Sequence, residues 1–310
     1  MDKASSMNDK THRIAFFGSD EIALPFLSSV KDDPNFGTIS AVLTQPDRRS
    51  GRGRKLRQNP IKEWALEHHV PVEDPEKPSD GQAQWLKSLE IDLVVVMAYG
   101  HILKRDLLEV APSGCFNLHA SLLPAFRGAS PIETALAMGE RETGVTLMRV
   151  APRMDAGPIV DVERVAIGEK DTGQTLRSKI AQACVPLMGR NLRPLLGGGV
   201  NETPQDEALA TYCRKLTKLD GELDFSCANV KHIAAKRITR RFVARTNAGG
   251  LKSSEVVAAN KEAITDTHIF ADPNDETLLN TERADDVVAE RVERLIVHRV
   301  LQIAFRATQS

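Results

Sequence analysis

The chain has 310 residues, enough for two domains of ordinary size, and its 41% hydrophobic and 27% charged residues are typical of a soluble globular protein. The formal net charge of -1 excludes a protein that is basic throughout, so any contact with nucleic acid has to come from a local basic patch. The cysteines form no Cys-x-x-Cys pair and the N-terminus has no apolar signal core, so we expect a reduced cytoplasmic setting, no metal site and no membrane insertion.

Short apolar runs alternate with amphipathic stretches after a polar tail, residues 1–12, that we expect to be disordered. Strands are predicted over residues 13–18, 39–43, 91–97, 115–119, 144–150 and 159–162. Helices are predicted over residues 22–30, 61–69, 82–89 and 172–195. This alternation predicts an α/β fold with a doubly wound, mostly parallel, Rossmann-like sheet that binds its ligands at the carboxyl ends of the strands.

A run of three glycines, Gly197–Gly199, opens a polar segment that we interpret as a linker over residues 197–210. It separates a first domain, residues 13–196, from a second domain, residues 211–310. The second domain contains only short β-prone pieces before a helical stretch near the C-terminus, so its structure is hard to predict from the sequence.

The strongest chemical signal is the pair Asn117 and His119 at the end of a predicted strand. Residues at positions i and i+2 of a strand point to one face, so an amide donor and an imidazole would project together into the ligand crevice. Such groups can hold a carbonyl oxygen as negative charge develops on it, and imidazole can relay a proton near neutral pH. Asp155, beside a predicted turn, is the candidate that orients the imidazole and accepts a proton.

No serine or cysteine nucleophile accompanies these three residues, which favours direct attack by a substrate amine. By itself, an Asn-x-His pair on a strand is more often structural than catalytic, so the pattern leaves both interpretations open.

Several blocks make the sequence similar to a known family over residues 13–225. They are Phe16–Ser19, Thr44–Arg48, Gly51–Leu56, Val96–Gly100, Asn117–Pro124, Arg127–Ile132, Glu142–Thr146, Met154–Gly157 and Lys215–Lys218. In this order they resemble the folate-dependent formyltransferases, and among these the methionyl-tRNA formyltransferase family.

The resemblance implies that Asn117, His119 and Asp155 are catalytic. It implies a formyl transfer from 10-formyl-tetrahydrofolate to the α-amine of initiator methionyl-tRNA, by a monomer that needs no metal. It also implies a C-terminal β-barrel of the oligonucleotide-binding type. The residues that would bind the folate are Met97, Tyr99, Ser121, Leu122, Leu123 and Pro124, although Met97 and Tyr99 are equally consistent with core residues.

Residues 48–57, with the sequence RRSGRGRKLR, carry six cations and two glycines. We expect a mobile loop that can follow a phosphate backbone, although a run of charge is also typical of a solvated loop with no ligand. The resemblance favours contact with tRNA and points to Arg52 as the main residue. The candidate tRNA-binding residues are Arg48, Arg49, Arg52, Arg54, Lys55 and Arg57.

Two features depart from the family pattern. The basic-aromatic pair after the Leu-Leu-Pro segment is replaced by Ala125 and Phe126, and residues 240–247 read RRFVARTN where the family has an Asn-Pro-Trp-Pro segment. One alternative is therefore a folate-dependent formyltransferase that acts on a small amine, such as an amino sugar nucleotide. Another is a non-catalytic RNA- or folate-binding protein that keeps the fold.

Overall fold

The computed structural model describes residues 12–32, 37–50, 55–168 and 170–217, together with the backbone of residues 222–223 and 243–244. The predicted tail, except His12, and nearly all of the predicted second domain with its barrel lie outside the described residues. The chain divides into two units, one of Met1–Ala135 with Glu140–Lys215 and one of Leu136–Gly139 with Leu216–Ser310. In the second unit, β12 (Glu222–Leu223) pairs in parallel with β13 (Val243–Ala244).

A seven-stranded sheet forms the centre of the first unit, with the order β10-β9-β7-β6-β1-β2-β5. Its first five strands in the chain run parallel, whereas β9 is antiparallel to β7 and β10 is antiparallel to β9. The predicted doubly wound, mostly parallel sheet is therefore confirmed. The strands are β1 (Arg13–Gly18), β2 (Thr38–Leu43), β5 (Val72–Glu73), β6 (Leu93–Met97), β7 (Cys115–His119), β9 (Glu142–Arg149) and β10 (Ile159–Ala166).

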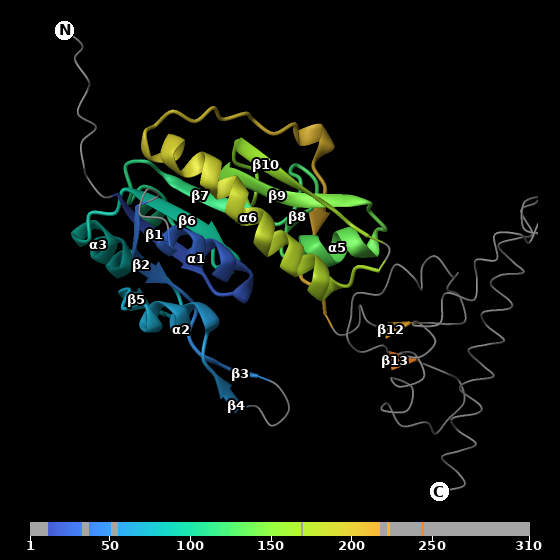
Figure 1. The fold of residues 1–310 in the computed structure, drawn as a ribbon, viewed down its shortest axis with the longest axis horizontal. Helices are drawn as coiled ribbons and strands as arrows, with labels where there is room; N and C mark the ends of the chain where they lie inside the picture. The colour runs from blue at the N-terminus through green and yellow to red at the C-terminus, as the bar shows by residue number, and fades with distance from the viewer. Residues whose placement is uncertain are drawn as a thin grey trace, which may run out of the picture. The chain divides into compact units, whose positions relative to one another are not determined.

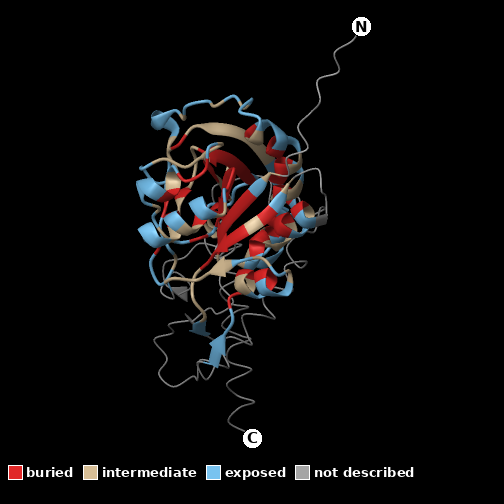
Figure 2. Cartoon of the chain, turned by 90° about the vertical axis from the view of Figure 1, so that its left-hand side faces the viewer, coloured by how far each residue is buried: buried red, intermediate tan, exposed pale blue. Residues whose placement is uncertain are grey.

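Helices cover both faces of this sheet, and the alternation of side chains along β1 assigns the faces (Figure 1). Phe16 meets Phe26 of α1 (Leu24–Asp32) with their ring centroids 5.9 Å apart, on the face where α6 (Gly173–Leu196) also packs. Ala15 and Phe17 point the other way, into an apolar cluster with residues of α3 (Asp80–Ser88) and α4 (Arg105–Leu108). Figure 2 shows the result, with the strands largely buried between exposed helix surfaces.

Hydrogen bonds join the carboxyl ends of the central strands. The main-chain N–H of Gln45, after β2, donates to Ser19 Oγ, after β1, at 3.1 Å. The Gln45 side chain donates to the main-chain oxygen of Tyr99, after β6, at 2.7 Å. The strand order reverses between β1 and β6, which is where doubly wound folds bind their ligands.

The basic segment 48–57 was predicted to be a mobile loop, but its two ends pair as the strands of a hairpin. β3 (Arg48–Ser50) pairs with β4 (Lys55–Arg57) in antiparallel orientation. Asp47 Oδ1 accepts the main-chain N–H of Asn59 at 3.0 Å, and this hydrogen bond lowers the pKa of Asp47. Because this bond closes the segment at its base, the two arms are brought side by side and can pair.

Several short elements complete the described fold. They are η1 (Glu21–Ala23), α2 (Pro60–Glu67), β8 (Arg127–Gly128), α5 (Pro131–Ala137), η3 (Glu207–Leu209) and β11 (Tyr212–Cys213). β11 pairs in parallel with β8, and Thr203 forms an antiparallel bridge with Ile159. The segment predicted as a linker thus returns along the sheet it follows. Within the described part of the chain, no helix is long and apolar enough to cross a membrane.

Candidate active site

The carboxyl end of β7 carries Asn117 and His119 on one face of the sheet. Cys115, two positions before Asn117, belongs to the apolar cluster with α3 and α4, so all three side chains project to that side. His119 is only 6% exposed, and its Nε2 lies 2.9 Å from the main-chain oxygen of Phe126. Asn117 is half-buried, and its side chain has no hydrogen-bond partner among the described residues, which leaves the amide available to a substrate oxygen.

Asp155 approaches the imidazole from the turn that follows β9. Its Oδ2 lies 3.6 Å from Nδ1 of His119 and accepts the main-chain N–H of Gly128 at 2.9 Å. The structure therefore brings together His119 and Asp155, which are 36 positions apart in the sequence. The second oxygen of the carboxylate has no partner within the described chain.

The contacts of His119 determine which of its nitrogens carries a proton. A carbonyl oxygen only accepts hydrogen bonds, so the contact with Phe126 assigns a proton to Nε2. In the neutral ring, Nδ1 would then present a lone pair to the carboxylate of Asp155. A proton taken up at Nδ1 would instead lie between the ring and that carboxylate. The carboxylate of Asp155 therefore lies beside the ring nitrogen that does not contact Phe126.

The loop after β7 holds the residues predicted to bind folate. Ser121 is fully buried, and its hydroxyl donates to the main-chain oxygen of Ala125 at 2.6 Å. Thr146 of β9 donates to the Ser121 main-chain oxygen and accepts the Leu123 N–H, and the Leu123–Pro124 peptide bond is cis. The Ser121 side chain therefore shapes the loop, whereas Leu122 and Pro124 are half-buried. Contact with folate stays a prediction for these four residues.

Met97 and Tyr99 lie at the end of β6 and are 1% and 2% exposed. The sulfur of Met97 lies 3.8 Å from Cys184 Sγ of α6, on the face opposite to that of Asn117. Tyr99 packs into the apolar cluster 5.8 Å from the ring of Phe17, and burial raises the pKa of its hydroxyl. Both side chains are core residues in this structure, and their predicted contact with folate is not tested by it.

The basic hairpin presents its described cations to solvent. Arg48 pairs with Glu76 through two hydrogen bonds, of 2.7 and 3.1 Å, and Leu56 between the cations is 66% exposed. Arg49, Lys55 and Arg57 are exposed as well. Arg52 and Arg54 lie outside the described residues.

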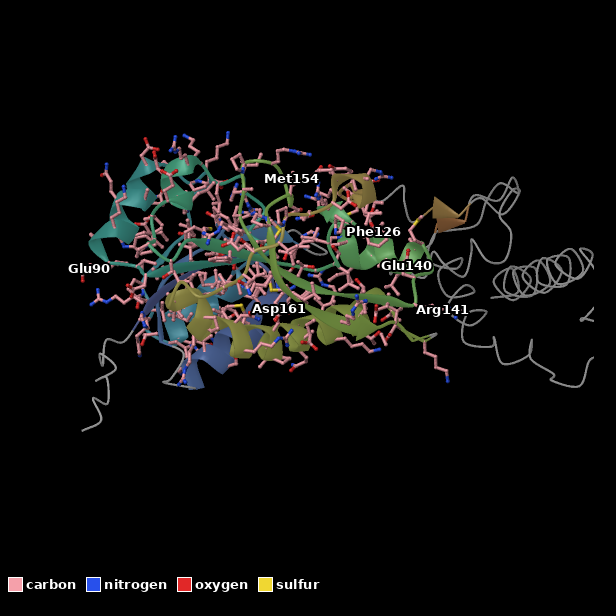
Figure 3. The ribbon with its side chains drawn as sticks, turned by 90° about the horizontal axis from the view of Figure 1, so that it is seen from above. Glu90, Phe126, Glu140, Arg141, Met154 and Asp161 are labelled. Carbon is pink, nitrogen blue, oxygen red and sulfur yellow. The ribbon has the colours of Figure 1, made fainter. Side chains whose placement is uncertain are left out.

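Sequence reasoning assigned no role to Arg127, which is completely buried in the structure. Its guanidinium donates to Glu207 at 3.0 and 3.1 Å, to Gln205 at 2.8 and 3.0 Å and to Tyr212 at 3.3 Å. The hydrogen bond with Glu207 raises the pKa of Arg127 and lowers that of Glu207. No local pattern signals this burial because the partners follow Arg127 by about 80 residues. Figure 3 labels Phe126 and Met154, the residues before Arg127 and Asp155.

Among the described residues, no three histidine, cysteine, aspartate or glutamate side chains form a group that could hold a metal ion. The three described cysteines are buried and unpaired. Burial raises the pKa of Cys115 to about 12, so this thiol beside the site stays protonated near neutral pH.

The sequence pattern of the family described as "Formyl transferase" matches residues 12–191, which contain Asn117, His119 and Asp155. The chain belongs to this formyltransferase family.

Curated relatives narrow the assignment to the methionyl-tRNA formyltransferases. The methionyl-tRNA formyltransferase of Halalkalibacterium halodurans is 41% identical over 214 residues, which are 69% of this chain and 67% of that protein. That of Pseudomonas putida is 40% identical over 254 residues, 80% of each chain. The chain is therefore an enzyme of the methionyl-tRNA formyltransferase family, and its reaction is a folate-dependent formyl transfer.

Solved structures of formyltransferases share the fold. An N-formyltransferase from Helicobacter canadensis, in complex with folinic acid and an amino sugar nucleotide, superimposes with a TM-score of 0.59 at 18% identity, over 76% of this chain and 84% of that chain. A sugar N-formyltransferase from a Shewanella species gives a TM-score of 0.60 at 15% identity, over 78% of this chain and 95% of that chain. At these identities the likeness concerns the fold alone.

Proposed function

We propose that this formyltransferase transfers the formyl group of 10-formyl-tetrahydrofolate to the α-amine of methionyl-tRNA, with Asn117, His119 and Asp155 as its catalytic residues. The observation that supports this mechanism best is the 3.6 Å approach of Asp155 to His119, beside Asn117 on the same strand face. The relatives at about 40% identity support the choice of acceptor.

The reaction begins when the lone pair of the acceptor amine attacks the formyl carbon. Negative charge then develops on the formyl oxygen, and the Asn117 amide and the His119 imidazolium stabilise it. One well-aimed donor of this kind is worth about 2.7–4 kcal/mol. Asp155 orients the ring and assists removal of a proton from the attacking amine. The bond from carbon to N10 of the folate breaks as N10 takes up a proton, and the products are the formylated amine and tetrahydrofolate.

The basic hairpin is the part of the described unit best suited to hold a tRNA backbone. Its exposed cations stand on two short strands whose base is fixed by Asp47 and Asn59. Exposed arginine and lysine side chains on such a support can contact phosphates without reading bases, which suits an enzyme that handles the acceptor end of a tRNA. We assign Arg48, Arg49, Arg52, Arg54, Lys55 and Arg57 to this contact.

The test is a formyl-transfer assay with the full-length protein and 10-formyl-tetrahydrofolate. Methionyl-tRNA is offered as one acceptor and a nucleotide-linked amino sugar as the other, and formylated product is measured for each. Methionyl-tRNA with an acetylated α-amine is the matched control, because it keeps every RNA contact but lacks the nucleophile. We expect product from methionyl-tRNA alone.

Transfer only to the amino sugar would overturn the proposed acceptor and retain the chemistry. Binding of tRNA or folate without transfer to any amine would support the non-catalytic alternative and overturn the mechanism.

A further inference from the structure

The turn that carries Asp155 adopts a backbone conformation that needs support. Asp155 has a φ of +48°, in the left-handed region that residues other than glycine seldom occupy. Such a conformation costs about 1–3 kcal/mol and persists only where the surroundings hold it. The position of the Asp155 carboxylate relative to His119 therefore depends on the contacts that fix this turn.

Gln205, from the segment after α6, supplies two of those contacts. Its side-chain Nε2 donates to the main-chain oxygen of Asp155 at 2.9 Å and to that of Gly157 at 2.7 Å. The two hydrogen bonds bracket the turn, because the carbonyl groups lie two positions apart on the chain. Gln205 does not touch the carboxylate itself, so it can act on the reaction only through the placement of Asp155.

Arg127 fixes the Gln205 side chain in the orientation that this role requires. Gln205 Oε1 accepts Nε of Arg127 at 3.0 Å and Nη2 at 2.8 Å. A guanidinium only donates and a carbonyl oxygen only accepts, so a flipped amide would lose all four hydrogen bonds. The buried Arg127 is itself held by Glu207, which leaves the amide no alternative arrangement.

The same short strand also reaches the carboxylate directly. Gly128, next to Arg127, donates its N–H to Oδ2 of Asp155 at 2.9 Å. Gly128 has a φ of +120°, and a Cβ there would collide with the main-chain oxygen of Cys213 in β11. β8 therefore fixes the position of the Asp155 carboxylate through Gly128. It fixes the position of the Asp155 main chain through Arg127 and Gln205.

We infer that Gln205 is a positioning residue for formyl transfer, which holds the Asp155 turn so that the carboxylate stays within reach of His119. This inference rests on the proposed role of Asp155. It adds to the proposed site a residue that lies outside residues 12–191, the span that the family pattern matches. The catalytic unit then includes the segment that follows α6.

The test compares Gln205→Leu and Gln205→Glu with the unaltered enzyme, by measuring kcat, the KM for each substrate and the pH profile of kcat. Gln205→Leu removes all four hydrogen bonds. Gln205→Glu keeps an acceptor for Arg127, so the segment after α6 stays attached to β8. It also places a carboxylate oxygen against the carbonyl oxygens of Asp155 and Gly157, which repel it. We expect both variants to lower kcat by about tenfold to a hundredfold with little change in KM, because displacements of about 1 Å have effects of this size. We also expect a displaced pH profile.

Glu202→Gln is the matched control for loss of docking. Glu202 binds Arg149 through hydrogen bonds of 2.5 to 2.9 Å and attaches the same segment to β9, but it does not contact the Asp155 turn. We expect this variant to lower the thermal midpoint and to leave kcat and its pH profile unchanged. A loss of kcat in Glu202→Gln equal to that in Gln205→Leu would overturn the inference, because docking alone would then explain both.

A double-variant cycle with Asp155→Asn separates this inference from the proposed function. If Gln205 acts through Asp155, adding Gln205→Leu to Asp155→Asn slows the enzyme no further, because residues that act as a unit are not additive. Additive losses would overturn the positioning role. An unaltered kcat in Asp155→Asn would overturn the proposed mechanism, whereas a slow Asp155→Asn with a normal Gln205→Leu would overturn only the inference.

Discussion

At the scale of single residues, the amide of Asn117 and the ring of His119 carry the proposed stabilisation of charge. We expect Asn117→Ala and His119→Ala each to lower kcat by about a hundredfold or more, because the first removes a donor to the developing oxyanion and the second removes the imidazolium charge beside it. Steady-state rates with saturating methionyl-tRNA check this expectation, and circular dichroism confirms that the variants fold. Rates equal to those of the unaltered enzyme would remove the residue concerned from the mechanism.

The local sequence pattern was sufficient to place this pair on one strand face, but it did not identify the residues that surround the pair. Asn117 and His119 could be assigned to one face because a strand fixes the direction of every second side chain. Gln205 and Arg127 could not be found in this way, because their roles come from contacts between segments about 80 residues apart in the chain. The resemblance suggested Met97 and Tyr99 as pocket residues, and the structure buries both side chains, so their contact with folate stays a prediction.

At the scale of elements, the basic hairpin is expected to act through charge. Arg52→Ala should raise the KM for methionyl-tRNA and leave the KM for the folate unchanged, because one phosphate contact is lost. The plot of log KM against log salt should lose about one unit of slope. Lys87→Ala, an exposed cation in the last turn of α3, is the control with the same loss of charge. An unchanged salt dependence in Arg52→Ala would remove this arginine from the tRNA contact.

The contact between β10 and α6 should make stability depend on pH. Burial opposes ionisation of Asp161, but hydrogen bonds from Arg190 and Asn191 outweigh it and lower the pKa of the carboxyl group below its ordinary value. A lowered folded-state pKa stabilises the protein above the unfolded pKa of about 3.9, and this stabilisation is lost as pH falls through the folded value. Asp161→Asn should therefore lower the thermal midpoint near neutral pH, by about 2–4 °C for a contribution of about 1 kcal/mol.

The difference in midpoint between Asp161→Asn and the unaltered protein should shrink below about pH 3.9. Calorimetry across this range measures the difference in midpoint. Glu163→Gln, which also loses a hydrogen bond to Arg190, is the control that shows whether loss of any carboxylate partner of Arg190 has the same pH dependence. A difference that stays constant over the whole range would contradict the assignment.

At the scale of the whole molecule, stability depends on a sheet covered on both faces. Leu86 of α3 is fully buried in the apolar cluster, so Leu86→Ala should lower the free energy of unfolding by about 2–5 kcal/mol. Leu66→Ala, in α2, changes a side chain that is 50% exposed and should have little effect. Urea titrations of both variants compare them, and equal losses would show that burial at Leu86 does not determine the difference.

The alternation of the main strands and helices could be predicted because some buried strands are continuous apolar runs, as residues 93–97 show. The hairpin at residues 48–57 could not, because its pairing depends on the closure by Asp47 and Asn59 rather than on apolar alternation. The path of residues 200–213 back along the sheet was also missed, since its polar composition is typical of a linker and its partners lie far away in the sequence.

The buried guanidinium of Arg127 limits how this enzyme can be recombined with a relative. Among the described residues its carboxylate partner is Glu207, which follows α6. A chimera that joins foreign sequence directly after Leu196 exchanges that carboxylate and can leave the buried guanidinium without its counter-charge, which destabilises the fold. A crossover after Cys213 takes Arg127 and Glu207 from the same parent. The suitable crossover point therefore lies after β11 rather than at the glycine run.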